Sequence, residues 1–152
     1  MPTHSLELQL ASACTPIPSA AQIQHWVDTA LAAYTEPLEV VVRIVDVAEM
    51  SELNQTYRHK QGPTNILSFP FEAPEGIEMD LLGDLVVCAP VVAQEAQEQG
   101  KQLEHHWAHI IVHGIFHLLG YDHIDDSEAE AMEAMEIKVL QQLNITNPYQ
   151  EQ

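Results

Sequence analysis

The chain has 152 residues, of which 46% are hydrophobic, and its formal net charge is -18 from 23 acidic and 5 basic residues. This length suits one domain with a sizeable core, so we predict a single domain over residues 1–152. No segment approaches the roughly 18 apolar residues of a membrane span. Taken alone, the acidic excess argues against nucleic-acid and anionic membrane partners, but a local cationic site can coexist with an acidic surface elsewhere.

The N-terminal segment and the cysteines indicate a cytoplasmic location. MPTHSLELQLAS has no basic stretch followed by a long apolar run, so we predict no signal peptide. Cys14 and Cys88 lie far apart and form no CxxC pair. We therefore expect two reduced, packed thiols.

The first half of the chain predicts two strands and two helices. Residues 5–11 alternate apolar and polar side chains, as a half-buried strand does. Ser19 is placed to cap a helix over residues 20–34. Residues 38–45 form a β-branched run typical of a buried strand, and a helix over 46–58 follows. The first helix has one apolar face, formed by Ile23, Trp26, Val27, Ala30 and Leu31.

Two further strands follow. Residues 65–71 read as a strand, and Pro70 places it at a sheet edge or makes this its end. Residues 72–80 read as a loop. Residues 81–89 form the next strand, and Pro90 suits the first turn of the helix after it.

The last part of the chain is helical. A long helix covers roughly residues 102–119 and is predicted to stop at Gly120. A final helix starts at Ser127, where Glu130 three residues later suggests a capping box. Its predicted apolar stripe consists of Met132, Met135, Val139 and Leu143. Together these elements predict one α+β domain with a small mixed β-sheet and about five helices.

The densest chemistry lies in HGIFHLLGYDH, residues 113–123. His113 and His117 are four residues apart, so both imidazoles lie on one helix face and can reach one ion. After the turn at Gly120 the chain returns with His123 as a third ligand. Zinc binds histidine nitrogen at about 2.0–2.1 Å.

Other histidine pairs compete for this assignment. His105 with His109, and His109 with His113, have the same spacing. Only His113 with His117 is followed by a glycine turn and a further histidine, so we leave His105, His106 and His109 out of the ligand set. Asp122 is a candidate for orienting one imidazole from outside that set. The plain alternative is a set of histidines that merely decorate a helix.

Three nitrogen ligands leave one tetrahedral position open, which favours catalysis over a purely structural metal. The pattern HxxxHxxGxxH is that of metzincin peptidases, except that they carry glutamate after the first histidine. Gly114 occupies that position here. It cannot take a proton from water, which weakens a peptidase hypothesis. Phosphodiester cleavage instead needs positive charge from the protein or a metal ion to stabilise its negatively charged transition state.

Three motifs in register resemble the YbeY family of bacterial metal-dependent endoribonucleases. They are HGIFHLLGYDH, the upstream LNQTYRHKQGPTNILSFPF and the central LLGDLVV. HWAH at 106–109, the acidic last helix and the closing NPY agree with it. The resemblance implies a zincin-like fold and endoribonuclease activity on single-stranded ribosomal RNA. The implied roles are maturation of the 16S ribosomal RNA 3′ end and quality control of the 70S ribosome.

The same resemblance implies one zinc ion held by His113, His117 and His123, with Arg58 as the catalytic residue. A guanidinium binds phosphate bidentately, which lysine cannot match. From its position alone, an arginine at a helix end such as Arg58 is more often a charge complement at the helix C-terminus or part of a surface ion pair than a functional residue. The chain departs from the family at Asn65, where many members have aspartate, so an essential carboxylate there is in doubt.

Several other residues have a plain interpretation beside a functional one. Lys60 is an auxiliary phosphate contact or a solvated lysine. Trp26 and Trp107 are at helical core positions and favour packing over base stacking. The acidic helix at 127–143 is a solvated face with an apolar underside, or a docking face for a basic ribosomal protein.

Two alternative functions stay open from sequence. One is a zinc peptidase that obtains its base from elsewhere, and the other is a non-catalytic ribosome assembly factor with a structural metal. Because the chain is so acidic, we expect weak binding to free RNA, with specificity supplied by the small ribosomal subunit and its proteins. We predict no DNA partner and no membrane partner.

Overall fold

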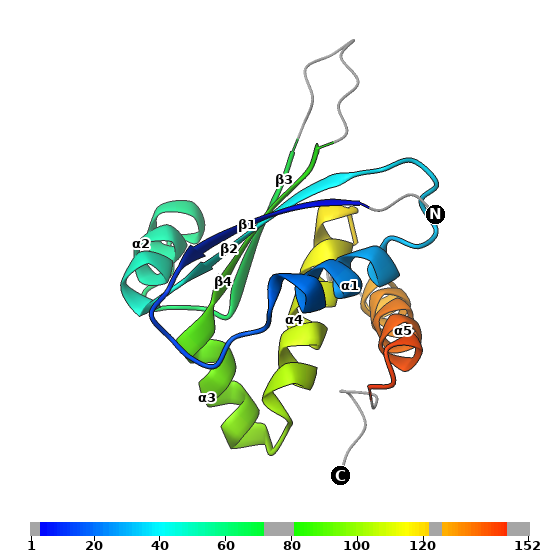
Figure 1. Cartoon of the computed structure of the whole chain (residues 1–152). Coiled ribbons are helices and arrows are strands. Elements are labelled where there is room, and N and C mark those ends of the chain that lie inside the picture. The colour runs from blue at the N-terminus through cyan, green and yellow to red at the C-terminus, as the bar shows by residue number, and fades with distance from the viewer. Residues whose placement is uncertain (1–3, 72–80, 122–125, 146–152) are drawn as a thin grey trace.

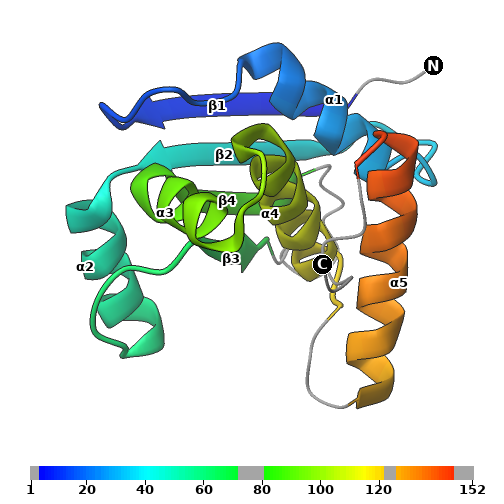
Figure 2. The ribbon, with the colours of Figure 1, turned by 90° about the horizontal axis from the view of Figure 1, so that it is seen from below.

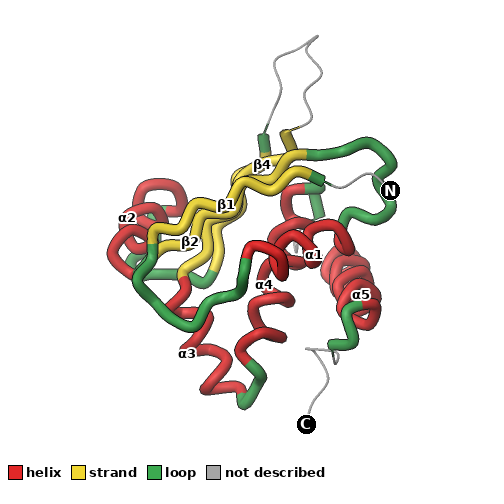
Figure 3. The backbone as a smooth tube through the Cα atoms, viewed as in Figure 1, coloured by secondary structure: helices red, strands yellow, loops and turns green. Residues whose placement is uncertain are grey.

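The computed structural model describes residues 4–71, 81–121 and 126–145. The predicted order of strand, helix, strand, helix, two strands and three helices is confirmed (Figure 3). The elements are β1 (Ser5–Ala11), α1 (Ala20–Ala30), β2 (Glu39–Val45), α2 (Val47–Arg58), β3 (Ile66–Pro70), β4 (Leu81–Cys88), α3 (Ala89–Gln99), α4 (Leu103–Leu118) and α5 (Asp126–Gln142).

The four strands form a mixed sheet in the order β1-β2-β4-β3. β1 pairs with β2 and β2 with β4 in parallel, whereas β3 is an antiparallel edge strand. Pro70 ends β3 opposite Gly83, as its lack of an N–H requires. Gly83 has φ +152°, and an added Cβ would lie 2.5 Å from the carbonyl oxygen of Phe69. The LLGD sequence therefore needs glycine for β3 to approach this closely.

Helices α1, α3, α4 and α5 lie on one side of the sheet, and α2 lies at one end of the strands (Figures 1 and 2). The main core lies between the sheet and α4, where Trp107 and Ile111 are buried against Val42 and Leu85. A second, smaller cluster surrounds Met50 of α2. The predicted α+β class, with a mixed sheet and five helices, is confirmed for the described residues.

The start of α1 follows the sequence prediction. Gln22 N–H donates to the hydroxyl of Ser19 at 3.1 Å, and Ser19 N–H donates to Oε1 of Gln22 at 2.9 Å, which closes a capping box. All five predicted apolar residues of this helix are buried. The helix ends at Ala30, earlier than the predicted Tyr34. The N–H of Leu31 still donates to the carbonyl of Val27, but the N–H of Ala32 donates to that of Thr29, three residues back, so the α-helical pattern stops there.

The start of α5 and one residue of its apolar face, Met135, were predicted wrongly. Met132 and Val139 are buried, and Leu143 packs against the main core, as predicted. The helix begins at Asp126, so Ser127 lies within it and is not its N-cap. Met135 is 37% exposed, whereas Glu136 is fully buried. The underside of this acidic helix therefore buries one carboxylate as well as apolar side chains. The predicted loop at 72–80 lies outside the described residues.

Both cysteines are free, Cys88 buried and Cys14 partly buried. Burial raises the pKa of the Cys88 thiol, which keeps it protonated at neutral pH. Trp26 and Trp107 are 4% and 1% exposed, so both pack in the core as predicted. Among the helices of the described residues, none has the length and apolarity that crossing a bilayer requires.

Replacing Ser19 by alanine removes the hydroxyl that accepts from the N–H of Gln22, while the backbone N–H at this position can still donate to Gln22. This loss is expected to lower the free energy of unfolding by about 1 kcal/mol. Urea denaturation monitored by circular dichroism measures this difference. Ser19→Thr keeps the hydroxyl and serves as the matched control. Equal midpoints for Ser19→Ala and the unaltered chain would contradict this role of the box.

Candidate metal centre

Helix α4 carries three histidines along one face. His109, His113 and His117 are spaced by four residues and are each partly exposed. The opposite face of α4 packs against the sheet through buried apolar residues. The histidine face is therefore fixed by how the helix packs.

The end of α4 follows from Gly120. Gly120 has φ +102°, its N–H donates to the carbonyl of His117 at 3.0 Å, and the N–H of Tyr121 donates to that of Phe116 at 3.0 Å. This is a Schellman motif, and the ring contact between Phe116 and Tyr121 is its usual apolar partner. The predicted stop at Gly120 is confirmed, and it places the Tyr121 carbonyl beside His117.

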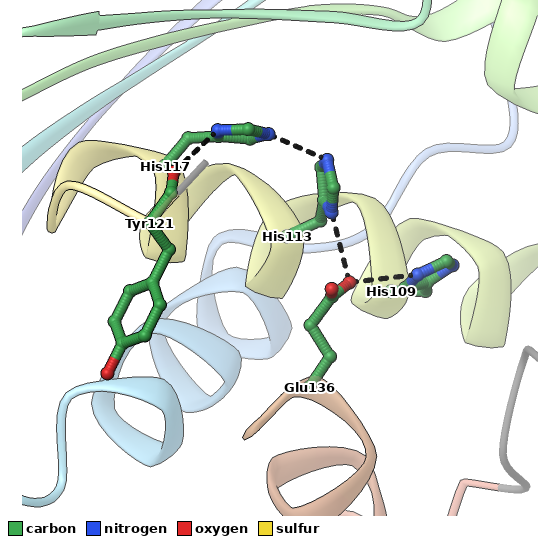
Figure 4. Close-up of polar contacts among 5 residues, drawn as sticks. All are labelled: His109, His113, His117, Tyr121 and Glu136. Carbon is green, nitrogen blue, oxygen red and sulfur yellow. Dashed lines mark hydrogen bonds and ion pairs between the residues drawn. The ribbon is translucent and has the colours of Figure 1, made fainter. Parts of the chain in front are cut away.

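His113 and His117 point their Nε2 atoms at one another, 3.0 Å apart (Figure 4). Nδ1 of His117 lies 3.1 Å from the carbonyl oxygen of Tyr121, and Nδ1 of His113 lies 3.1 Å from Oε1 of Glu136. A carbonyl and a carboxylate only accept hydrogen bonds, so both Nδ1 atoms carry the proton. In the neutral rings, both Nε2 lone pairs then face each other.

Two facing lone pairs repel each other unless a cation lies between them. Tetrahedral zinc with Zn–N distances near 2.05 Å would hold two such nitrogens about 3.3 Å apart. The observed separation of His113 and His117 is close to this value. The residues therefore fit a metal ion, and the hydrogen bonds at Nδ1 are the kind that orient metal-binding imidazoles.

Glu136 of α5 is the acid of this cluster. Its carboxylate is 0% exposed and accepts from Nε2 of His109 and from Nδ1 of His113, each at 3.1 Å (Figure 4). Burial is the largest single effect on its pKa and raises it, but the hydrogen bonds and charges of the two imidazoles together outweigh burial. The pKa of Glu136 falls to about 2, so the group is ionised.

His109, His113 and Glu136 form a second group that can hold a metal ion, with ligand atoms within 4.8 Å of one another. His109 was excluded from the ligand set by sequence, so this grouping differs from the predicted one. The two groupings share His113, which offers Nδ1 to Glu136 and Nε2 to His117. His123 and Asp122 lie outside the described residues.

A pocket of about 690 Å³ opens over the histidines. Arg58, the last residue of α2, lines it together with His113 and His117. The loop after Arg58 is held by Asn54, whose buried amide donates to the carbonyl of Gly62 at 2.9 Å. Of the described residues that line the pocket, none is acidic.

Asn65 also lines the pocket, where many relatives were expected to carry aspartate. Its amide donates to Glu95 at 3.2 Å, and Glu95 lies 3.0 Å from Nε2 of the buried His106. An aspartate at this position would place its carboxylate beside that of Glu95, and the two would repel each other. The amide of Asn65 instead donates a hydrogen bond to Glu95. Burial lowers the pKa of His106, and Glu95 offsets this only in part.

Gly114 faces away from the histidines, toward the sheet. A Cβ added there would lie 2.7 Å from Cδ1 of Ile66 and 2.8 Å from Cδ2 of Leu85. The position that carries glutamate in metzincin peptidases is therefore crowded here, and a side chain fits only if the ends of Ile66 and Leu85 shift. Crowding at position 114 thus gives a steric reason against the peptidase hypothesis.

Comparison with known proteins bears directly on this site. The family model described as endoribonuclease YbeY matches residues 12–144. A protein of Colwellia psychrerythraea named endoribonuclease YbeY is 52% identical over 153 residues, covering 98% of this chain and 99% of that protein. The chain belongs to the endoribonuclease YbeY family. The resemblance inferred from the three motifs is thus confirmed.

A solved structure agrees with the fold of this YbeY family member. The solution structure of TM1509 from Thermotoga maritima has a TM-score of 0.58 and 22% sequence identity, and the match covers 96% of this chain and 99% of that one. At this identity the likeness concerns the fold alone.

Glu136 was not predicted as a site residue from the sequence. The buried residues of α5 are Met132, Glu136, Val139 and Leu140, so the acid occupies a position on the apolar stripe. The predicted stripe used Met135 instead of its neighbour. A charged residue at the spacing of an apolar stripe was the signal that could have identified it.

Replacing Gly114 by glutamate is expected to destabilise the chain by several kcal/mol, because it buries a carboxylate between α4 and the sheet. Gly114→Ala is the matched control. Its Cβ costs about 1–3 kcal/mol in overpacking, offset by about 1 kcal/mol of helix propensity. Urea denaturation measures both, and a glutamate variant as stable as the alanine variant would contradict this steric account.

Replacing Glu136 by leucine is expected to remove the buried acceptor of two partly buried imidazoles, at a cost of about 1–3 kcal/mol in the absence of metal. Zinc affinity, measured by competition with a chromophoric chelator, should fall about 10- to 100-fold because the His113 ring loses its orientation. Glu130→Leu, on the exposed side of α5, is the control. Unchanged stability and unchanged affinity would remove Glu136 from this role.

Proposed function

We propose that this chain is a zinc-dependent endoribonuclease that cleaves single-stranded ribosomal RNA. The proposal includes maturation of the 16S ribosomal RNA 3′ end and quality control of the 70S ribosome, in the cytoplasm, with the whole chain, residues 1–152, as one domain of this type. Membership of the endoribonuclease YbeY family supports the reaction class. The family relative is named for cleavage of RNA, and the pocket has the chemistry that such a substrate needs.

The observation that carries the proposal is the composition of the pocket. The chain has 23 acidic residues, yet the described lining contains none of them and contains Arg58, His113 and His117. A phosphate is repelled by most of the protein surface and finds complementary charge in this pocket. A site built for a cationic or neutral peptide would not need this separation of charge.

We assign the metal to His113, His117 and His123, rather than to the group of His109, His113 and Glu136. The first two rings turn Nε2 toward the pocket, where a substrate can reach the ion. The second group is already satisfied by two hydrogen bonds at 3.1 Å to a carboxylate with no exposure. In this assignment Glu136 and the Tyr121 carbonyl orient the two imidazoles.

When bound, the ion supplies Lewis acidity at a phosphate oxygen and lowers the pKa of water in its coordination sphere. Arg58 binds the non-bridging phosphate oxygens with its guanidinium, in the bidentate geometry that phosphate favours. Because Arg58 is exposed at the end of α2 and enters the pocket, it needs no rearrangement of the core to do so. RNA brings its own 2′-hydroxyl, so a carboxylate base at position 114 is not required.

We also propose that the small ribosomal subunit and its proteins supply much of the specificity. A chain with a net charge of -18 is repelled by long stretches of RNA, and Arg58 with Lys60 gives few phosphate contacts. Binding to free RNA should accordingly be weak.

Arg58→Ala is expected to lower the rate of cleavage of a short ribosomal RNA 3′-end substrate by about 100- to 1,000-fold, because a charged donor to the transition state is lost. Zinc content should not change, since Arg58 is outside the assigned ligand set. Arg58→Lys keeps the charge without the bidentate geometry and should be intermediate.

Arg43→Ala is the matched control, because Arg43 pairs with Glu49 at 2.6 Å and does not line the pocket. His113→Ala prepared in the same way measures contaminating ribonuclease. Equal cleavage by Arg58→Ala and the unaltered chain would remove Arg58 from the mechanism. Equal cleavage by all variants would mean that the activity comes from a contaminant.

A further inference from the structure

Tyr57 is a large aromatic residue that the fold leaves exposed beside the candidate metal centre. Its relative exposure is 60%, the highest of the exposed large hydrophobic residues. It lies in the last turn of α2, immediately before Arg58, and lines the same pocket as Arg58, His113 and His117. Exposing an aromatic ring of this size to water is unfavourable unless a ligand covers it.

The ring of Tyr57 is held in place by Phe69 of β3. The two rings meet edge to face, with centroids 5.1 Å apart and an interplanar angle of 72°. Phe69 is itself partly buried and packs against the small cluster around Met50. Because Tyr57 is braced before any ligand arrives, a ligand that covers it costs less side-chain entropy than one that must order a mobile ring.

Because the chain has few basic residues, it can form few ionic contacts with a single-stranded nucleic acid. Of the five basic residues, Arg43 is paired with Glu49, and the three lysines, Lys60, Lys101 and Lys138, are not among the residues that line the pocket. Arg58 is thus the basic residue among the described lining. Binding that is poor in phosphate contacts needs a second source of affinity that does not depend on charge.

We propose that Tyr57, braced by Phe69, stacks on an unpaired nucleobase adjacent to the phosphate held by Arg58. This subsite rests on the proposed ribonuclease function and defines its substrate as single-stranded, because a base within a duplex has no free face. Stacking on an aromatic side chain tolerates any base, and its strength is independent of salt to first order. Thr64 and Ser68 line the same pocket and bring hydroxyl groups that can hydrogen-bond to the base edge.

The test compares three variants with the unaltered chain. Tyr57→Leu keeps an apolar side chain but loses the aromatic face, Tyr57→Phe keeps the face, and Tyr34→Leu removes an exposed tyrosine, 42% exposed, outside the pocket. For each we measure zinc content, the circular dichroism spectrum, and kcat and KM on a short single-stranded RNA. A second series places 2-aminopurine at each position around the cleavage point, because stacking on an aromatic ring quenches its fluorescence.

For Tyr57→Leu we expect KM to rise about 5- to 100-fold, with a much smaller change in kcat, and quenching to be lost at one position of the RNA. Tyr57→Phe should restore both, and Tyr34→Leu should match the unaltered chain. If the unaltered chain cleaves RNA but Tyr57→Leu has the same KM and the same quenching, the subsite is wrong while the ribonuclease function stands. If the unaltered chain neither binds nor cleaves the RNA, on its own or in assembled ribosomes, both proposals fall together.

Discussion

The hydrogen bond between the buried carboxylate of Glu136 and Nδ1 of His113 is the interaction on which the geometry of the site depends. It joins α5 to α4, so that the last helix fixes a ring on the central one. Because a carboxylate only accepts, the bond places the ring proton on Nδ1 and turns the Nε2 lone pair toward the pocket. His117 is oriented by a hydrogen bond from Nδ1 to the backbone carbonyl of Tyr121. This carbonyl lies beside the ring because α4 stops at Gly120.

The pocket differs in charge from the rest of the molecule, because its described lining contains no acidic residue although the chain is strongly acidic. Glu136 and Glu95 are both near it, yet each carboxylate is turned to a histidine. Asn65, on the lining itself, presents its amide to Glu95 and adds no negative charge. Arg58 therefore lies in a local environment without acids on the described lining, inside a protein of net charge -18. For the proposed function, this arrangement favours one phosphate at Arg58 and disfavours non-specific binding to a long polyanion.

Local patterns in the sequence predicted most of the fold. The alternation over 5–11, the cap at Ser19 and the stop at Gly120 depend on neighbouring residues, and the structure contains all three. The pairing of His113 with His117 is equally local, since it follows from helical spacing. Glu136 was missed because its partners come from another helix, and the proximity of Arg58 to the histidines depends on how α2 and α4 pack around β3. The resemblance, rather than any spacing, suggested Arg58; His123 stays a prediction.

Gly114 connects the packing of the helix to the choice of chemistry. A residue adjacent to His113 points about 100° away around the helix, here into the sheet, where a side chain would have to displace the ends of Ile66 and Leu85. The same close approach brings α4 against β3 and so places the histidines at the pocket that Arg58 enters. The close packing of α4 on the sheet therefore has two consequences. It disfavours a glutamate at position 114, and it places His113 and His117 in the same pocket as Arg58. RNA carries its own hydroxyl nucleophile and a phosphate, so it matches a pocket that offers Arg58, His113 and His117 but no carboxylate at position 114.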